Sequence, residues 1–104
     1  MSDVTTPDPD ASYRLLIGGD WVEAGDGTYP IVNPATEQVV GQAPNASVAD
    51  AEAAAEAAAA AFPAWARTSP DERAALIARA ADLLDQRYAE LVPLVQAETG
   101  ATLR

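Results

Sequence analysis

Residues 15–40, LLIGGDWVEAGDGTYPIVNPATEQVV, are the stretch that decides the fold. In its first half, Gly18 and Gly19 separate two short apolar runs, and glycine tolerates the positive φ angles of a tight reversal. In its second half, Asn33 and Pro34 separate two further runs that contain β-branched residues. The stretch therefore predicts two short antiparallel hairpins in succession.

The hairpin region is expected to span residues 13–43 and to follow a disordered tail over residues 1–12. The tail is acidic, contains proline and has no hydrophobic periodicity. Pro30 falls inside the third expected strand, and proline cannot donate a hydrogen bond to a neighbouring strand. Pro30 therefore implies either an edge position for that strand or the start of the strand.

Two helix starts follow the hairpins. Ser47 with Asp50, and Ser69 with Glu72, both have the spacing of a capping box, in which side chains satisfy N–H groups of the first turn. The first helix is expected over residues 48–62, which are mostly alanine, the strongest helix former.

Prolines and one glycine mark the expected helix ends. Pro63 is expected to end the first helix, because proline removes a helical hydrogen bond. Pro93 interrupts any continuous second helix, so a break is expected at residues 87–90. A third short helix is expected to run to about Ala97, with Gly100 as its C-terminal cap.

The predicted fold class is α+β, with two β-hairpins followed by three helices over residues 47–104. Alanine supplies most of the 49% hydrophobic content, and its small side chain buries little apolar area. A chain of 104 residues is one small domain at most. Both layers of this domain are therefore expected to need a partner.

Charge and composition exclude several classes of function. The net charge of −10 disfavours nucleic acids and anionic membranes, because both are bound through clustered cations. Residues 1–12 lack the basic start and apolar run of a signal peptide, and no apolar run reaches the roughly 18 residues of a membrane span. The sequence therefore predicts a soluble, cytoplasmic chain without nucleic-acid or membrane partners.

The residue types that carry most enzyme chemistry are missing. The chain has no cysteine, histidine or lysine, which excludes a thiolate nucleophile, an imidazole base and a Schiff base. Pro30 stands where a phosphate-binding G-x-G-x-x-G motif starting at Gly25 needs its last glycine. The carboxylates that share helix faces are expected to lie in water; they are the pairs Glu52/Glu56 and Asp82/Asp85.

Five sequence motifs in a fixed order resemble the amino-terminal part of the NAD(P)-dependent aldehyde dehydrogenase family. The resemblance covers residues 13–104, and related acyl-CoA reductases and semialdehyde dehydrogenases share much of it. The motifs are IGGDWV at 17–22, YPIVNPAT at 29–36, AAFPAW at 60–65, SPDERAALIARAADLL at 69–84 and AETG at 97–100.

This resemblance implies the start of an α/β cofactor-binding domain in an enzyme that oxidises an aldehyde to a carboxylic acid with NAD or NADP. The family's catalytic cysteine, its glutamate and its cofactor contacts correspond to positions beyond residue 104. No catalytic or cofactor-binding residue is therefore assigned here, and no cofactor is expected on this chain alone. The implied partners are the remainder of the polypeptide, a small aldehyde and further copies of the full-length enzyme.

The resemblance also points to three candidate residues for a monovalent cation. Some family members hold such an ion through two backbone carbonyls before the Asn-Pro turn and an acid near the end of the third helix. The matching positions are Ile31, Val32 and Glu98. Ala101 follows Gly100 where many members have lysine, which hints at a subgroup acting on other aldehydes, such as aromatic ones.

Two alternatives remain beside a truncated aldehyde dehydrogenase. The chain could be a free-standing acidic interaction module that binds a partner through its apolar helix faces. It could also be the start of an acyl-CoA reductase or a semialdehyde dehydrogenase. Residues beyond 104 would distinguish these enzymes.

Overall fold

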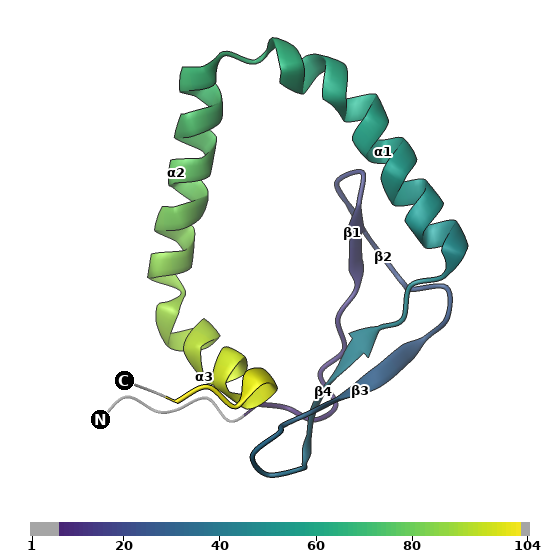
Figure 1. The fold of residues 1–104 in the computed structure, drawn as a ribbon, viewed down its shortest axis with the longest axis vertical. Coiled ribbons are helices and arrows are strands. Elements are labelled where there is room, and N and C mark those ends of the chain that lie inside the picture. Colours follow the sequence, from purple (N-terminus) through teal and green to yellow (C-terminus); the bar gives the residue numbers. More distant parts are fainter. Residues whose placement is uncertain (1–6, 103–104) are drawn as a thin grey trace.

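The computed structural model describes residues 7–102, and their order of elements confirms the predicted α+β fold class. The described part of the chain holds two hairpins followed by three helices (Figure 1). The elements are β1 (Leu15–Ile17), β2 (Asp20–Val22), β3 (Thr28–Val32), β4 (Val39–Pro44), α1 (Val48–Arg67), α2 (Pro70–Gln86) and α3 (Tyr88–Thr99).

Each hairpin is a separate two-stranded antiparallel sheet. In the first, Leu16 pairs with Trp21, and the reversal uses Gly18 and Gly19 at φ 61° and 87°. Both values lie in the left-handed region that glycine adopts without steric cost. The predicted first turn is therefore confirmed, together with its chemical reason.

The second hairpin contains a β-bulge. Ile31 pairs with Gly41, whereas Val32 pairs with Val39, so Val40 is the extra residue on β4. A bulge bends its strand and increases the local twist. Here it lies beside the turn that joins β3 to β4, which faces the end of α3.

Pro30 is tolerated because its partner in the register uses its backbone elsewhere. Gln42 lies opposite Pro30, but its N–H donates to the Ala11 carbonyl at 2.8 Å and its carbonyl accepts from the Tyr13 N–H at 3.4 Å. Residues 1–6 of the expected tail lie outside the described residues, whereas Ser12 forms an isolated bridge with Gln42. The edge position predicted for the third strand is confirmed within the described sheet.

The predicted end of the first helix was wrong. α1 continues through Pro63 to Arg67, because proline removes only the hydrogen bond to Ala59 and the following turn is closed by a cap. The Thr68 N–H donates to the Ala64 carbonyl at 3.1 Å, and the Thr68 hydroxyl donates to the same carbonyl at 2.9 Å. The expectation that Pro63 ends the helix overlooked this cap.

The other helix boundaries follow the sequence more closely. Both capping boxes are present at Ser47 and Ser69. The expected break between the second and third helices is confirmed at Arg87, and Pro93 lies inside α3. α3 ends at Thr99 rather than near residue 97, with Gly100 capping it at φ 72°.

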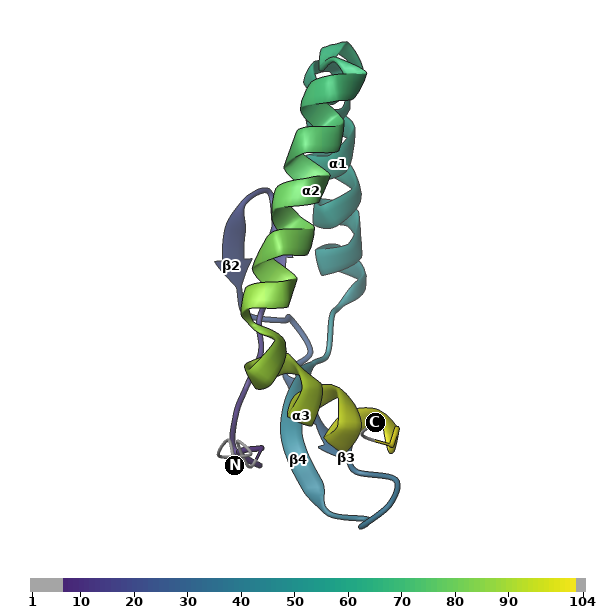
Figure 2. The same cartoon turned by 90° about the vertical axis from the view of Figure 1, so that its left-hand side faces the viewer.

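The helices are arranged as an open arch. α1 and α2 diverge from their connection at residues 68–69 (Figure 1), and the arch is thin when viewed from the side (Figure 2), with extents of 46 × 35 × 18 Å. The radius of gyration is 17.1 Å, against about 13 Å for a compact chain of this length. Its contacts join α1 to β1, α2 to α3 and α3 to β3.

Very little of this arch is buried. Ala97 is the one buried hydrophobic side chain within residues 7–102. The accessible surface is 8008 Å², whereas a folded chain of 10.8 kDa exposes roughly 5,500 Å². The chain thus exposes on the order of 2,500 Å² more than a compact chain of the same mass.

Candidate functional site

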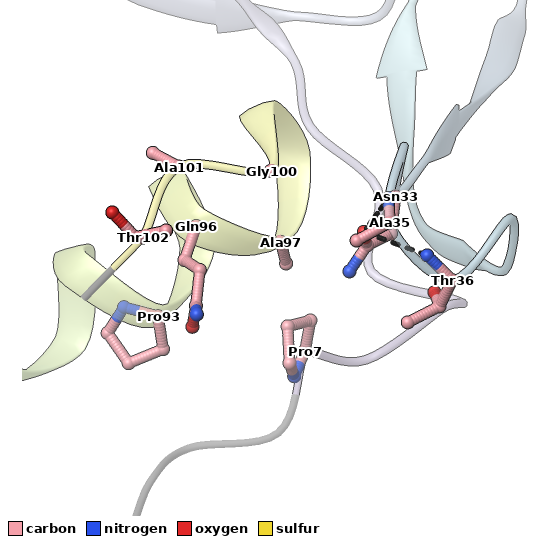
Figure 3. Close-up of a pocket in the computed structure, with 10 residues that line it drawn as sticks. All are labelled: Pro7, Asn33, Ala35, Thr36, Pro93, Gln96, Ala97, Gly100, Ala101 and Thr102. Carbon is pink, nitrogen blue, oxygen red and sulfur yellow. Dashed lines mark hydrogen bonds between the residues drawn. The ribbon is translucent and has the colours of Figure 1, made fainter.

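A pocket with a partly polar lining lies where the turn after β3 meets the end of α3 (Figure 3). Its volume is about 420 Å³. Asn33 shapes the turn, because its side-chain oxygen accepts the N–H groups of Ala35 at 2.8 Å and Thr36 at 3.4 Å. The lining residues are Pro7, Asn33, Ala35, Thr36, Pro93, Gln96, Ala97, Gly100, Ala101 and Thr102.

The turn and the helix end approach closely at Gly100. A Cβ atom placed there would lie 2.9 Å from Pro34 Cγ, and φ is 72°. Glycine is therefore required on both conformational and steric grounds. This contact brings two segments together that lie more than 60 residues apart in the chain.

The three candidate cation residues flank this pocket without lining it. Ile31 and Val32 belong to the end of β3, and Glu98 is an exposed residue of α3. The structure brings these two elements into contact, but within residues 7–102 no group of three or more acidic, histidine or cysteine side chains surrounds a metal position. A monovalent-cation site at these residues stays a prediction.

The carboxylates that sequence analysis weighed for acid–base chemistry are exposed, as expected. The shifted pKa values have local structural causes. The N–H of Gly25, followed by that of Ser47, lowers the pKa of Asp50. Arg87 Nη2 lies 2.6 Å from Glu90 Oε1. The hydrogen bond between these side chains raises the pKa of Arg87 and lowers the pKa of Glu90.

The connection between β2 and β3 does not form a glycine-rich phosphate loop. Gly25 is packed against a side chain, since a Cβ there would lie 2.6 Å from Ser47 Oγ. Gly27 takes φ 78° in a turn, and its N–H donates to the Ala24 carbonyl. These glycines connect β2 to β3 and leave no phosphate cradle of the glycine-rich type.

A second candidate functional surface is the apolar face of α2, made of Leu76, Ile77, Leu83 and Leu84. Their spacing places all four on one side of the helix. Each is exposed, from 47% for Leu76 to 66% for Ile77. Such a contiguous apolar face is typical of an interface.

Sequence reasoning missed the long-range contact of Asp50. Its capping role was predicted, but its carboxylate also accepts the Gly25 N–H at 2.7 Å, across 25 residues. No local pattern links positions so far apart. The same holds for the approach of Gly100 to Pro34.

No helix among the described residues combines the length and apolar character that a bilayer crossing requires.

A family model described as "Aldehyde dehydrogenase family" matches residues 21–104. The chain therefore belongs to the aldehyde dehydrogenase family, and it corresponds to the amino-terminal portion of these enzymes. This confirms the resemblance seen in its motifs.

Individual proteins show the same relationship. The vanillin dehydrogenase of Corynebacterium glutamicum is 43% identical over 90 residues, which are 86% of this chain and 19% of the relative. A human methylmalonate-semialdehyde/malonate-semialdehyde dehydrogenase [acylating] is 40% identical over 93 residues, 88% of this chain and 17% of the relative. The chain thus spans under a fifth of the length of these curated relatives.

The fold matches a solved structure over the same region. The crystal structure of an NAD-dependent benzaldehyde dehydrogenase from Corynebacterium glutamicum superposes with a TM-score of 0.77 at 43% identity. The match covers 84% of this chain and 19% of the other. The two hairpins and three helices are therefore shared with the corresponding region of a complete enzyme.

Proposed function

We propose that this chain is the outer, non-catalytic part of an NAD(P)-dependent enzyme that oxidises an aldehyde to a carboxylic acid. The observation that carries the proposal is family membership combined with a composition lacking cysteine, histidine and lysine. The family's thiolate chemistry cannot be performed by these residues. The 104-residue chain alone is expected to be inactive and to bind no cofactor.

The proposed partner of this chain is the remainder of its own polypeptide. The exposed apolar face of α2 and the surface excess on the order of 2,500 Å² support that partner. An area of this size exceeds the roughly 800 Å² that each partner buries in a standard protein–protein interface. We further propose that the complete enzyme is a cytoplasmic homo-oligomer.

Aromatic aldehydes are the proposed substrate class. The support comes from the names of two similar proteins, which act on vanillin and benzaldehyde, and from Ala101 in place of lysine. NAD is the acceptor named for the benzaldehyde enzyme. NADP stays an alternative acceptor for the enzyme proposed here.

The test begins with the coding sequence after Arg104. The extended reading frame would be expressed and assayed for reduction of NAD and of NADP with benzaldehyde and with an aliphatic aldehyde. We expect turnover with the extended protein and none with residues 1–104. A genuine stop codon directly after Arg104, or cysteine-independent turnover by the short chain, would contradict the proposal.

An acylating reaction is the second candidate function, favoured by the similarity to the human acylating semialdehyde dehydrogenase. The same extended protein would then form an acyl-CoA when coenzyme A is supplied. Product analysis with and without coenzyme A separates the two reactions. A free acid as the only product in both assays would exclude the acylating candidate.

The free-standing interaction module makes a different prediction for the isolated chain. A module that is complete by itself would be monomeric and would unfold cooperatively. A partial domain with exposed apolar faces would aggregate or form a molten state. Sedimentation and calorimetry of residues 1–104 distinguish these outcomes.

A further inference from the structure

The attachment of α1 to the rest of the molecule depends on two points. Of its residues, Asp50 and Ala57 are the two that are half-buried, and the others are exposed. Ala57 lies against the tip of the β1–β2 hairpin, where a Cβ placed on Gly18 would be 3.7 Å from its own Cβ. With so little burial along the helix, its direction must depend on the polar contact at its first turn.

That contact is a corner formed by Gly25, Ser47 and Asp50. The Asp50 Oδ2 atom accepts the N–H of Gly25 at 2.7 Å and the N–H of Ser47 at 2.8 Å. The Ser47 hydroxyl oxygen in turn accepts the Asp50 N–H at 3.1 Å. One carboxylate thus joins the β2–β3 connection to the start of α1.

Neighbouring backbone bonds reinforce the corner. The Asp26 N–H donates to the Asn45 carbonyl at 3.1 Å, and the Asn45 N–H donates to the Gly27 carbonyl at 2.8 Å. Any side chain at Gly25 would meet Ser47 Oγ at 2.6 Å. The two segments are therefore held at a distance that only glycine allows.

The start of α2 provides an internal comparison. Glu72 forms the same kind of capping box, accepting the Ser69 N–H at 3.3 Å. Within the described part of the chain, the Glu72 carboxylate accepts hydrogen bonds from Ser69 alone. Asp50 and Glu72 thus share a capping role, and only Asp50 reaches a distant segment.

We propose that the Asp50 carboxylate is a positioning group that sets the direction in which α1 leaves the β3–β4 hairpin. Hydrogen bonds to an ionised acceptor are roughly twice as strong as neutral ones, so the charge matters as well as the geometry. A helix of 20 residues is about 30 Å long, and a rotation of 10° at the corner moves its far end by about 5 Å. This role concerns conformation and is independent of the enzymatic activity proposed above.

The experiment uses the extended polypeptide described under the proposed function, in which a partner covers the apolar faces, and NMR spectroscopy. The variants are Asp50→Asn and Gly25→Ala, with Glu72→Gln as the matched control from the other capping box. Three quantities are measured: amide exchange at Gly25, the nuclear Overhauser contact between Gly18 and Ala57, and the helicity of α1 from carbon chemical shifts.

We expect Asp50→Asn to speed amide exchange at Gly25 by at least about tenfold and to remove the Gly18–Ala57 contact while α1 stays helical. Gly25→Ala should also remove that contact, and Glu72→Gln should preserve both signals. An unprotected Gly25 amide in the parent would overturn the proposal, and so would an intact Gly18–Ala57 contact in Asp50→Asn. Melting of α1 in Asp50→Asn would also overturn it, because Asp50 would then act only as a helix cap.

Discussion

Two regions of the molecule differ in the interactions that stabilise them. One consists of the two hairpins and α3, and the other consists of α1 and α2. The first region is joined across the sequence by the β3–β4 ladder, the Gly100–Pro34 contact and the burial of Ala97. α1 and α2 contain no buried residue, yet both begin with complete capping boxes. The difference shows that local hydrogen bonding defines these two helices, while their apolar side chains stay exposed.

The largest expected effect concerns the apolar face of α2. In the extended polypeptide, Leu84→Ala should lower the free energy of unfolding by about 2–5 kcal/mol, because the partner would bury this side chain. In the isolated chain, where Leu84 is 62% exposed, the same change should leave the helical content measured by circular dichroism unchanged. Denaturant unfolding of the extended protein measures the loss of stability, and a change within about 0.5 kcal/mol there would mean that nothing covers the face.

Two glycine substitutions test the contact that joins the hairpins to α3. Gly100→Ala should destabilise the chain by about 1–3 kcal/mol, because φ is 72° and the new Cβ meets Pro34. Gly19→Ala is the control, with φ 87° and open space around it. It should cost about 1 kcal/mol, from the backbone alone. Equal losses in thermal unfolding would show that the Pro34 contact contributes nothing.

The corner between the two regions should respond to acid. The pKa of Asp50 is lower when folded, chiefly through the Gly25 N–H, so its contribution is present above the unfolded value of about 3.9. This contribution is lost as pH falls through the lower folded pKa. Protection of the Gly25 amide from exchange, measured from pH 6 to pH 2, should fall in the parent and change less in Asp50→Asn, because Asp50 accepts this N–H; identical profiles would contradict this.

The smallest effect is expected at the exposed ion pair beside the first hairpin. Arg14 Nε and Glu23 Oε1 lie 2.9 Å apart, with 58% and 74% of their side chains exposed. Glu23→Gln should change stability by less than about 0.5 kcal/mol, because water screens such pairs. Thermal unfolding at low and high salt checks this, and a larger loss at low salt would give the pair a structural role.

Much of the local structure could be predicted from the residues themselves. Ser47 and Ser69 predicted both helix starts, and Gly18 and Gly19 predicted the first turn. These predictions succeed because capping and positive φ angles depend on residues close together in the sequence. The end of α1 could not be predicted in this way. Pro63 is a strong local stop signal, but Thr68 closes a further helical turn beyond it.

The candidate site likewise has a part that the sequence predicted and a part that it did not. The sequence named Ile31, Val32 and Glu98 through a family resemblance, and the structure brings their two elements into contact without placing the three residues in the pocket between them. The pocket itself depends on the approach of Gly100 to Pro34. Its shape is a property of two distant segments, so it has no signature in either one.

The sequence by itself determined the family, the order of the elements and the missing catalytic residue types, because these follow from composition and from signals within a few residues. Only the tertiary structure decided that α1 and α2 open into an arch, that Asp50 reaches Gly25, and that the apolar face of α2 stays exposed. The physical reason is that burial and long-range hydrogen bonds depend on which segments meet in space. Neighbouring residues alone do not contain that information.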